Sequence, residues 1–328
     1  MNEINELLTN YSKEVKKAID DSLSTIIPNN LQEASIYLTN AGGKMIRPAI
    51  TLIVSEALGS DKEGSLNAAA SIELIHTFSL IHDDIMDDDD VRRGVPAVHK
   101  VWGDDVAILS GDTLFSKAFE LIINSDKSPT QNNNALATVA DACVQICEGQ
   151  ALDISFEGRF DVSEEEYMTM VFKKTGALIA AASKVGAIMG GANDEVSNIM
   201  YEYGKLIGIA FQIQDDYLDV VGDEKDIGKP VGSDIAKGKM TLMVVKALSE
   251  ADEEDSKTLL KILKSDDSSN DDIDLAISIF EKYGSIQYAH DVALGNVNKA
   301  KELLKILPDN EAKKVLALIA DFVLERHS

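Results

Sequence analysis

Two long apolar stretches, far apart in the chain, contain the same aspartate pattern DDxxD. The first, "AAASIELIHTFSLIHDD", leads to Asp87, and the second, "MYEYGKLIGIAFQIQDDYLDVV", contains Asp215, Asp216 and Asp219. Both place apolar residues three and four positions apart, which predicts helices. Residues four apart share a helix face, so Asp83 and Asp87 form one pair and Asp215 and Asp219 another. Because like charges at this spacing destabilise a helix, a cation or solvent must offset their repulsion.

The rest of the chain follows the same helical pattern. "AKKVLALIADFVLERH" is a further example, convincing alternating strands are absent, and there are only six prolines. Clusters of Gly, Pro, Asn and Asp predict loops at "NAGGKMIRP", "DDDVRRGVP", "NSDKSPTQNNN" and "KSDDSSNDD". Length alone suggests about two domains, but no linker marks a boundary. We therefore expect one all-α domain over residues 1–328.

Composition excludes several classes of protein. A net charge of −25 argues against nucleic-acid binding, which needs a basic surface. No apolar run reaches the roughly 18 residues of a membrane span, and "MNEINELLTN" lacks the features of a secretory signal. Cys143 and Cys147 are spaced for one face of a buried helix rather than for a disulfide, redox or metal site. We expect a cytoplasmic protein without stable membrane insertion, with its acidic runs on solvated surface.

The aspartate groups have two interpretations. A single DDxxD fits a solvated acidic helix end, but two copies, each in a strongly apolar helix, favour a shared function. If the two helices pack side by side, their carboxylates face one cleft. Carboxylate oxygens suit Mg²⁺, which also keeps waters and binds substrate phosphates. His76 and His82 lack the HExxH spacing of a zinc site, and the EF-hand pattern is absent.

Basic residues follow the first aspartate group. Arg92 and Arg93 lie at the same end of the predicted helix as Asp87, where they can bind a diphosphate through forked hydrogen bonds. The alternative is that they only neutralise residues 87–90.

A second basic cluster is "AGGKMIRP". Its glycines allow a close backbone approach, and Pro48 fits the first position of a helix. Lys44 and Arg47 would then lie beside a helix N-terminus, which is an anion site. The P-loop pattern does not fit, because Leu38 and Met45 occupy two of its required positions.

Three further positions have open interpretations. His76 lies seven residues before Asp83 on the same face, either as a core residue or as a ligand contact. In "FKKTGAL", Gly176 follows Lys174 and Thr175 at a point where a helix could kink. "GDEKDIGKPVGSDIAKGK" is either a surface loop or a lid that brings Lys229 and Lys239 onto phosphate.

Taken together, the two DDxxD helices, "GGKMIRP" and "RRG" resemble the trans-isoprenyl diphosphate synthases, also called the polyprenyl synthetase family. The resemblance runs from about Gly42 to Lys239. It implies an all-α fold around a deep central cavity, as a homodimer. It also implies condensation of isopentenyl diphosphate with an allylic diphosphate, assisted by Mg²⁺, with about two or three ions per site.

The resemblance assigns roles residue by residue. Ligands of the isopentenyl diphosphate group are then Lys44, Arg47, His76 and Arg93. The Mg²⁺ ligands come from Asp83, Asp84 and Asp87 and from Asp215, Asp216 and Asp219, with Asp83, Asp87 and Asp215 foremost. The allylic diphosphate is held by Arg92, Lys174 and Lys229, with Lys239 as a weaker candidate, and Thr175 and Gln212 lie beside the reacting carbons. Met45 departs from the family, where many relatives carry a basic residue.

The implied chemistry starts with cleavage of the allylic C–O bond. Metal ions and basic side chains stabilise the departing diphosphate. The allylic cation is attacked by the double bond of isopentenyl diphosphate, and the released diphosphate is a plausible acceptor for the proton that is then lost. Dry apolar walls keep water away from the cation. An acidic protein can bind such polyanions because metal ions bridge the two.

Product length depends on what lies beneath the first DDxxD. Ser79 is small, whereas Phe78 is bulky but lies off the aspartate face by helical spacing. Within the family, an aromatic residue there and the absence of a two-residue insertion in the motif resemble the archaeal short-chain type. This favours all-trans geranylgeranyl diphosphate (C20), made from C5 to C15 primers, with farnesyl diphosphate as an earlier product. A farnesyl or longer-chain synthase, a class I terpene cyclase, a non-catalytic partner subunit and a helical ion binder remain as alternatives.

Overall fold

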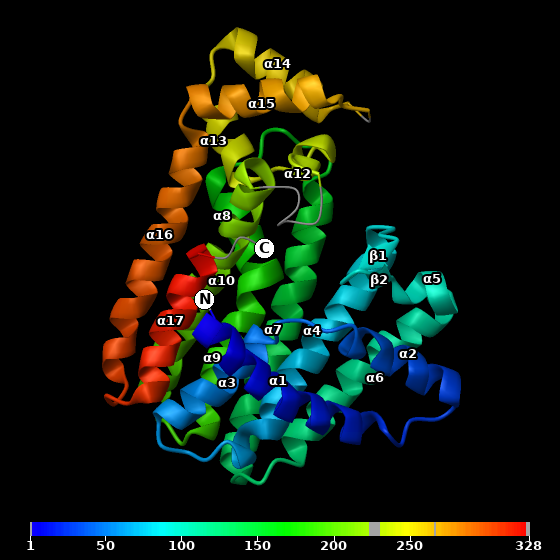
Figure 1. The fold of residues 1–328 in the computed structure, drawn as a ribbon, viewed down its shortest axis with the longest axis vertical. Helices are drawn as coiled ribbons and strands as arrows, with labels where there is room; N and C mark the ends of the chain where they lie inside the picture. The colour runs from blue at the N-terminus through cyan, green and yellow to red at the C-terminus, as the bar shows by residue number, and fades with distance from the viewer. Residues whose placement is uncertain (1, 223–229, 266, 326–328) are drawn as a thin grey trace. The chain divides into compact units, whose positions relative to one another are not determined.

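The computed structural model describes residues 2–222, 230–265 and 267–325. Most of the described chain is helical, which confirms the predicted all-α class (Figure 1). Within the described ranges, the strands are limited to β1 (Val91–Arg92) and β2 (Val95–Pro96), an antiparallel hairpin in which Val91 pairs with Pro96. The hairpin occupies the predicted loop that follows the first aspartate group.

The chain divides into two compact units. Unit 1 comprises Met1–Cys143, Leu178–Gly204 and Leu304–Leu318, and unit 2 comprises Val144–Ala177, Lys205–Leu303 and Ile319–Ser328. Helices α7 (Pro129–Phe156), α10 (Asp194–Val221) and α17 (Glu311–Glu325) each begin in unit 1 and end in unit 2. The single domain expected from the sequence stays a prediction.

Unit 1 is built around α4 (Leu66–Met86), which packs most extensively against α6 (Asp104–Ile123). The approach is close at Gly111, where an added Cβ would lie 2.3 Å from Nε2 of His82. The unit's other elements include α1 (Asn2–Leu23), α2 (Asn29–Asn40), α3 (Ile46–Ala57), η1 (Glu63–Ser65), α5 (Val98–Trp102), most of α9 (Ala177–Met189) and η3 (Leu304–Ile306). Helix α1 buries residues seven and four positions apart, namely Leu8, Val15, Ile19 and Leu23, as an amphipathic helix should.

Besides the ends of α7, α10 and α17, unit 2 contains further helices within the described residues. They are α8 (Glu164–Val171), the π-helix η2 (Phe172–Gly176), α12 (Ser233–Ala236), α13 (Leu242–Glu250), α14 (Glu253–Leu263), α15 (Asn270–Lys282) and α16 (Ser285–Leu303). Helix α13 packs on α16 and on α8, and α14 packs beside α15. Helix α8 begins with a capping box in which Ser163 and Glu166 satisfy each other's backbone N–H groups.

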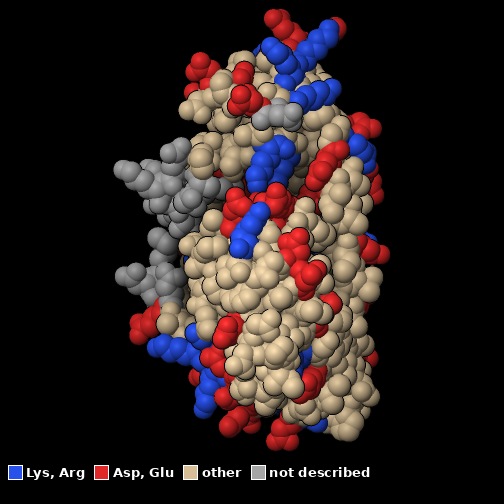
Figure 2. Space-filling model, turned by 90° about the vertical axis from the view of Figure 1, so that its right-hand side faces the viewer, with Lys and Arg blue, Asp and Glu red and all other residues tan. Residues whose placement is uncertain are grey.

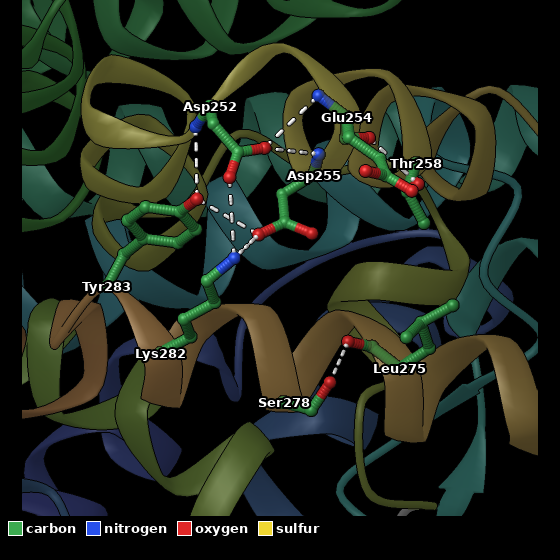
Figure 3. Close-up of polar contacts among 8 residues, drawn as sticks. All are labelled: Asp252, Glu254, Asp255, Thr258, Leu275, Ser278, Lys282 and Tyr283. Carbon is green, nitrogen blue, oxygen red and sulfur yellow. Dashed lines mark hydrogen bonds and ion pairs between the residues drawn. The ribbon is translucent and has the colours of Figure 1, made fainter.

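The acidic run near residue 252 has a structural use at the α14–α15 pair (Figure 3). Asp252 caps α14 by accepting from the backbone N–H groups of Glu254 and Asp255 at 3.1 and 3.0 Å. From the end of α15, Tyr283 donates its hydroxyl to Asp255 at 2.9 Å, and Lys282 contacts both aspartates. The run was expected on solvated surface. Asp252 is exposed and Asp255 is half-buried, and their carboxylates also tie two helices together.

Three local expectations need correction. Pro48 is the third residue of α3, not the first, because Met45 is the N-cap; its missing N–H still falls among those that a helix start leaves unpaired. Helix α7 already begins at Pro129, so only the first part of "NSDKSPTQNNN" is a loop. Cys143 is buried as expected, but Cys147, on the same helix, is exposed, and both thiols are free.

The surface agrees with the acidic composition. On the face drawn in Figure 2, most atoms belong to uncharged residues, and acidic side chains lie in small groups, some beside Lys or Arg. Within the described residues, each helix is too short or too polar to pass through a lipid bilayer.

Candidate functional site

The first aspartate group lies at the C-terminal end of α4 in unit 1. Asp83 is half-buried in the last turn, and Asp87 is the exposed C-cap residue, whose N–H donates to the Asp83 carbonyl at 2.8 Å. Spacings of three and four residues align Asp83 and Asp87 with His76 and Glu73 on one face. We refer to Glu73, His76, Leu80, Asp83 and Asp87 as the α4 stripe.

Arg92 pairs with aspartates of this same end. Its Nε donates to Oδ1 of Asp84 at 2.7 Å, and its Nη2 donates to Asp89 at 3.2 Å. Asp84 is 1% exposed; burial raises the pKa of its carboxyl, and the adjacent guanidinium opposes that rise. Neutralisation of acidic residues, the alternative considered for the two arginines, therefore describes part of what Arg92 does. The pairing with Asp84 and Asp89 also holds the Arg92 guanidinium beside the α4 stripe.

Helix α3 brings its N-terminus to the middle of the stripe. Met45 adopts a left-handed conformation (φ 44°) as its N-cap, and Arg47 is its second residue. Nη1 of Arg47 lies 3.3 Å from Nε2 of His76. Burial, with Arg47 and Arg93, holds the pKa of His76 well below its usual range, so the ring is neutral and Nε2 accepts this hydrogen bond. Lys44 is exposed just before the helix. Two basic side chains, Lys44 and Arg47, therefore lie at the N-terminus of α3, where the backbone N–H groups are unpaired.

Arg93 joins this cluster from the turn of the hairpin. It has a positive φ of 53°, and its Nη1 donates to the carbonyl of Leu38 at 3.2 Å. Its Nη2 donates to Oε1 of Glu73 at 3.4 Å. Gly43 (φ +141°) lies against the guanidinium, since an added Cβ would meet its atoms at 3.1–3.3 Å. The glycine pair, expected to admit a ligand, thus also makes room for Arg93.

Phe78 points away from the stripe toward α6. Its ring centroid lies 4.8 Å from that of His82 and 5.2 Å from that of Phe115, both in edge-to-face arrangements. Phe115 in turn lies 5.0 Å from Phe119. The residue therefore forms part of an aromatic row between α4 and α6.

The second aspartate group lies on α10 in unit 2, where its first two members differ. Asp215 is exposed, but Asp216 is 8% exposed and holds two hydrogen bonds. Tyr167 donates to its Oδ2 at 2.7 Å, and Nε2 of Gln212 donates to its Oδ1 at 2.9 Å. Gln212 in turn accepts from the Thr175 hydroxyl at 2.8 Å. Burial, with Asp234 nearby, raises the pKa of Asp216 to about 7, against the lowering effect of its two donors.

Asp219 caps a different element. It is 1% exposed, its Oδ1 accepts from the Ser233 hydroxyl at 2.6 Å, and its Oδ2 accepts from the Asp234 N–H at 3.0 Å. Both oxygens thus hold the start of α12. Lys239, exposed three residues after this helix, lies 3.6 Å from Oδ1 of Asp234.

The expected kink at "FKKTG" is a π-helix. Helix η2 carries Lys174 and Thr175 and passes so close to α7 that a Cβ on Gly149 would lie 2.2 Å from the Lys174 backbone nitrogen. π-bulges often occur at functional sites. Lys174 pairs with Asp153 of α7. Lys229, the other predicted phosphate ligand of this unit, lies outside the described residues.

The donor chemistry fits Mg²⁺. In either unit, the described residues form no group of three or more acidic, histidine or cysteine side chains arranged to hold a metal. Magnesium, however, needs only one or two protein carboxylates, because waters and substrate phosphate supply its other oxygens. Asp83 and Asp87 on α4 and Asp215 on α10 are accessible carboxylates of this kind.

Several residues of the two units were missed by the sequence analysis. Glu73 stands three residues before His76 in an apolar helix, so helical spacing could have found it. Tyr167, Ser233, Asp234 and Asp153 reach their partners only through the tertiary fold. No local pattern in the sequence marks them.

The comparisons with known proteins agree with this architecture. The family model described as polyprenyl synthetase matches residues 28–280. A short chain isoprenyl diphosphate synthase of Methanothermobacter thermautotrophicus is 57% identical, covering 99% of both chains. A geranylfarnesyl diphosphate synthase of Natronomonas pharaonis is 44% identical, over 95% of this chain and 94% of that one. The crystal structure of a geranylgeranyl pyrophosphate synthetase from Pyrococcus horikoshii superposes with a TM-score of 0.94 at 44% identity, covering 99% of both chains.

The all-α fold of this chain is thus shared with proteins named as synthases of isoprenyl diphosphates. The chain belongs to the polyprenyl synthetase family. Its enzyme class is that of a prenyltransferase, as the resemblance implied.

Proposed function

We propose that this prenyltransferase condenses isopentenyl diphosphate head-to-tail with allylic diphosphates of C5 to C15 to give all-trans geranylgeranyl diphosphate, with farnesyl diphosphate as an earlier product. The reaction needs two anion sites, one for each diphosphate. It also needs divalent cations at the diphosphate that departs.

The α4 stripe is the observation that carries this proposal. His76, with Arg47 against its ring, and Asp83 lie seven residues apart on one face of one helix. At 1.5 Å per residue, this separates the basic cluster from the aspartates by about 10 Å along a rigid rod. Two diphosphates bound at these two points would be held apart, with room between them for the reacting carbons. Such orientation supplies much of the rate enhancement in a two-substrate reaction.

Unit 2 would complete the allylic site. We propose that Asp215 of α10, like Asp83 and Asp87 of α4, binds Mg²⁺ of the allylic diphosphate. Lys174 and Lys229, with Lys239 in support, would neutralise the same diphosphate.

Each basic group has a defined task in this reaction. Lys44, Arg47, His76 and Arg93 bind isopentenyl diphosphate and keep its double bond facing the allylic carbon. Arg92 and Lys174 stabilise the leaving diphosphate as its charge grows. Thr175 and Gln212 are joined by a hydrogen bond and present polar atoms beside the reacting carbons.

Mg²⁺ would be held by Asp83, Asp87 and Asp215, and when bound it supplies charge neutralisation for the departing diphosphate. We propose about two or three ions per site. Asp84, Asp216 and Asp219, which the sequence also suggested as ligands, each accept hydrogen bonds from other side chains or backbone. They would hold neighbouring elements in place.

Product length is the finer part of the proposal. The compared proteins include synthases of geranylgeranyl and geranylfarnesyl diphosphate at equal sequence identity. Overall similarity therefore does not distinguish a C20 product from a product that is one isoprene unit longer. We propose that Phe78, backed by Phe115, limits the product to C20. A longer product is the alternative that the Natronomonas relative favours.

The test is a condensation assay with labelled isopentenyl diphosphate and each primer in turn, with and without EDTA. We expect a C20 product that EDTA abolishes. A hydrocarbon formed from a C20 diphosphate alone would instead identify a terpene cyclase. Binding of Mg²⁺ with no turnover under any primer would contradict the proposal.

We further propose a cytoplasmic homodimer in which residues 1–328 fold as one domain. Free thiols at Cys143 and Cys147 fit a reducing compartment. Ile108 and Leu109 of α6 are 43% and 54% exposed, which suits a subunit contact. Light scattering on the eluting protein would measure the mass, and a monomer at all concentrations would rule out the dimer.

A further inference from the structure

The most deeply buried acidic side chain near the first anion site is Glu73, which has no role in the chemistry described above. It lies on α4 three residues before His76 and is 1% exposed. A charged carboxylate is rarely buried without a specific partner, because it loses its hydration. Its surroundings should therefore explain why it is there.

Its surroundings are arginines. Oε1 of Glu73 accepts from Nη2 of Arg93 at 3.4 Å, and Oε2 has no hydrogen-bond partner among the described residues. Arg47 acts on the same carboxyl: burial raises the pKa of Glu73, while the charges of Arg93 and Arg47 lower it. The carboxylate thus contacts Arg93 directly and is influenced by the charge of Arg47, and both guanidiniums are assigned to the anion site.

Arg93 is contacted from three segments of the chain. Its guanidinium has three supports, which are the Leu38 carbonyl, the Glu73 carboxylate and the backbone of Gly43. The Leu38 and Glu73 contacts come from helices α2 and α4, and only the one to Glu73 joins opposite charges. Without it, two neighbouring guanidiniums would repel each other and Arg93 could swing toward solvent.

We propose that Glu73 is a positioning residue for isopentenyl diphosphate, which orients Arg93 and offsets part of the charge of Arg47 and Arg93, so that both guanidiniums bind the same diphosphate. The inference rests on the proposed function, because that function assigns this anion site its ligand. It differs from a purely structural role in one respect. Loss of Glu73 should weaken the binding of isopentenyl diphosphate and leave the binding of the allylic diphosphate nearly unchanged.

The test uses two substitutions and a matched control. Glu73→Gln keeps the shape and removes the charge, and Glu73→Asp keeps the charge but shortens its reach. The control is Thr77→Val, on the same helix and fully buried, whose hydroxyl has no hydrogen-bond partner among the described residues. Initial rates are measured while each substrate is varied at saturation of the other. Calorimetry measures binding of isopentenyl diphosphate without primer and with EDTA.

We expect Glu73→Gln to raise KM for isopentenyl diphosphate about tenfold or more, as the loss of a supporting residue behind a ligand contact does elsewhere. KM for the allylic diphosphate should change less than about twofold on the same reasoning. Glu73→Asp should lie in between, and Thr77→Val should match the unaltered protein. Equal changes in both KM values, or no change in either, would overturn the proposal.

A double-mutant cycle shows whether Glu73 acts through Arg93. If it does, Arg93→Gln combined with Glu73→Gln binds isopentenyl diphosphate no more weakly than Arg93→Gln alone. Additive losses would overturn the proposal. If Glu73→Gln does not fold, the double-mutant cycle and the comparison of KM values are carried out with Glu73→Asp instead.

The outcomes also separate this inference from the proposed function. If the unaltered protein forms no condensation product but calorimetry still shows weaker binding for Glu73→Gln, the proposed function fails and the role of Glu73 stands. If condensation proceeds normally in Glu73→Gln, the inference alone fails.

Discussion

Asp87, the last aspartate of the group on α4, is exposed, whereas Asp219, the last of the group on α10, is 1% exposed and caps α12. The middle aspartates resemble each other more closely. Asp84 is buried against Arg92, and Asp216 is buried against Tyr167 and Gln212. The first aspartate of each group is more accessible than the middle one: Asp83 is half-buried and Asp215 is exposed.

This difference shows that the same spacing serves different purposes in the two units. Helix α4 stops at its group, so Asp87 becomes a C-cap residue and projects into solvent. Helix α10 continues to Val221, and the chain returns so that Ser233 and Asp234 occupy both oxygens of Asp219. We therefore expect two metal ligands from the first group and one from the second, and the following experiments test that asymmetry.

The largest effect is expected for Asp83→Asn. Loss of one charged group at the departing diphosphate should lower kcat about 10²–10³-fold, by analogy with the removal of one preorganised donor. It should also raise the Mg²⁺ concentration needed for half-maximal rate. Steady-state rates over a Mg²⁺ series measure both. Asp112→Asn, an exposed aspartate on α6, is the control. An Asp83→Asn enzyme with near-normal kcat would remove Asp83 from the site.

Asp219→Asn should have a smaller and different effect. An asparagine has one acceptor oxygen, whereas the two carboxylate oxygens of Asp219 both accept hydrogen bonds at the start of α12. We therefore expect the free energy of unfolding to fall by about 1 kcal/mol, as for a lost helix cap. The rate should fall roughly tenfold or less, since no charge is lost at the diphosphate itself. Thermal melts and the Mg²⁺ series are the measurements.

Ser233→Ala is the matched variant, because it removes one of the same hydrogen bonds from the other side. The two variants should behave alike, with an unchanged Mg²⁺ requirement. If Asp219→Asn instead raises that requirement as far as Asp215→Asn does, the two aspartate groups are equivalent and the comparison fails.

The sequence predicted the parts of this protein that depend on neighbours along the chain. Helical periodicity identified α4 and α10, the ends of both were placed within a few residues, and the glycine in "FKKTG" marked the π-helix. That Arg47 and His76 come together was anticipated only through the family resemblance, because spacing along the chain does not relate α3 to α4. Sequence spacing could not distinguish Asp87 from Asp219, since the difference comes from α12, fourteen and fifteen residues further along the chain.

Tyr167→Phe tests the buried middle aspartate of the second group. The substitution leaves one oxygen of Asp216 without its donor, which should destabilise the fold by about 1–3 kcal/mol. Because Asp216 also holds Gln212, we expect a severalfold change in KM for the allylic diphosphate. Tyr203→Phe is the control, since its buried hydroxyl donates to the Leu316 carbonyl at 2.7 Å in unit 1. Both variants should lose stability, and equal loss of activity in the two would refute a role for Asp216 in the site.

The smallest effect on rate, and the most visible one on product, is expected for Phe78→Ala. Five residues before its first aspartate, α4 carries Phe78, whereas α10 carries Ala210 at the same offset. Only the first group therefore has an aromatic ring at this position, between α4 and Phe115. Removing the ring should lengthen the product beyond C20 while changing the rate less than about tenfold, because no charged group is lost. Chromatography of the products measures chain length, and Phe280→Leu, which alters a buried aromatic of unit 2, should leave it unchanged. An unaltered product ladder in Phe78→Ala would mean that chain length is set elsewhere than beneath the α4 aspartates.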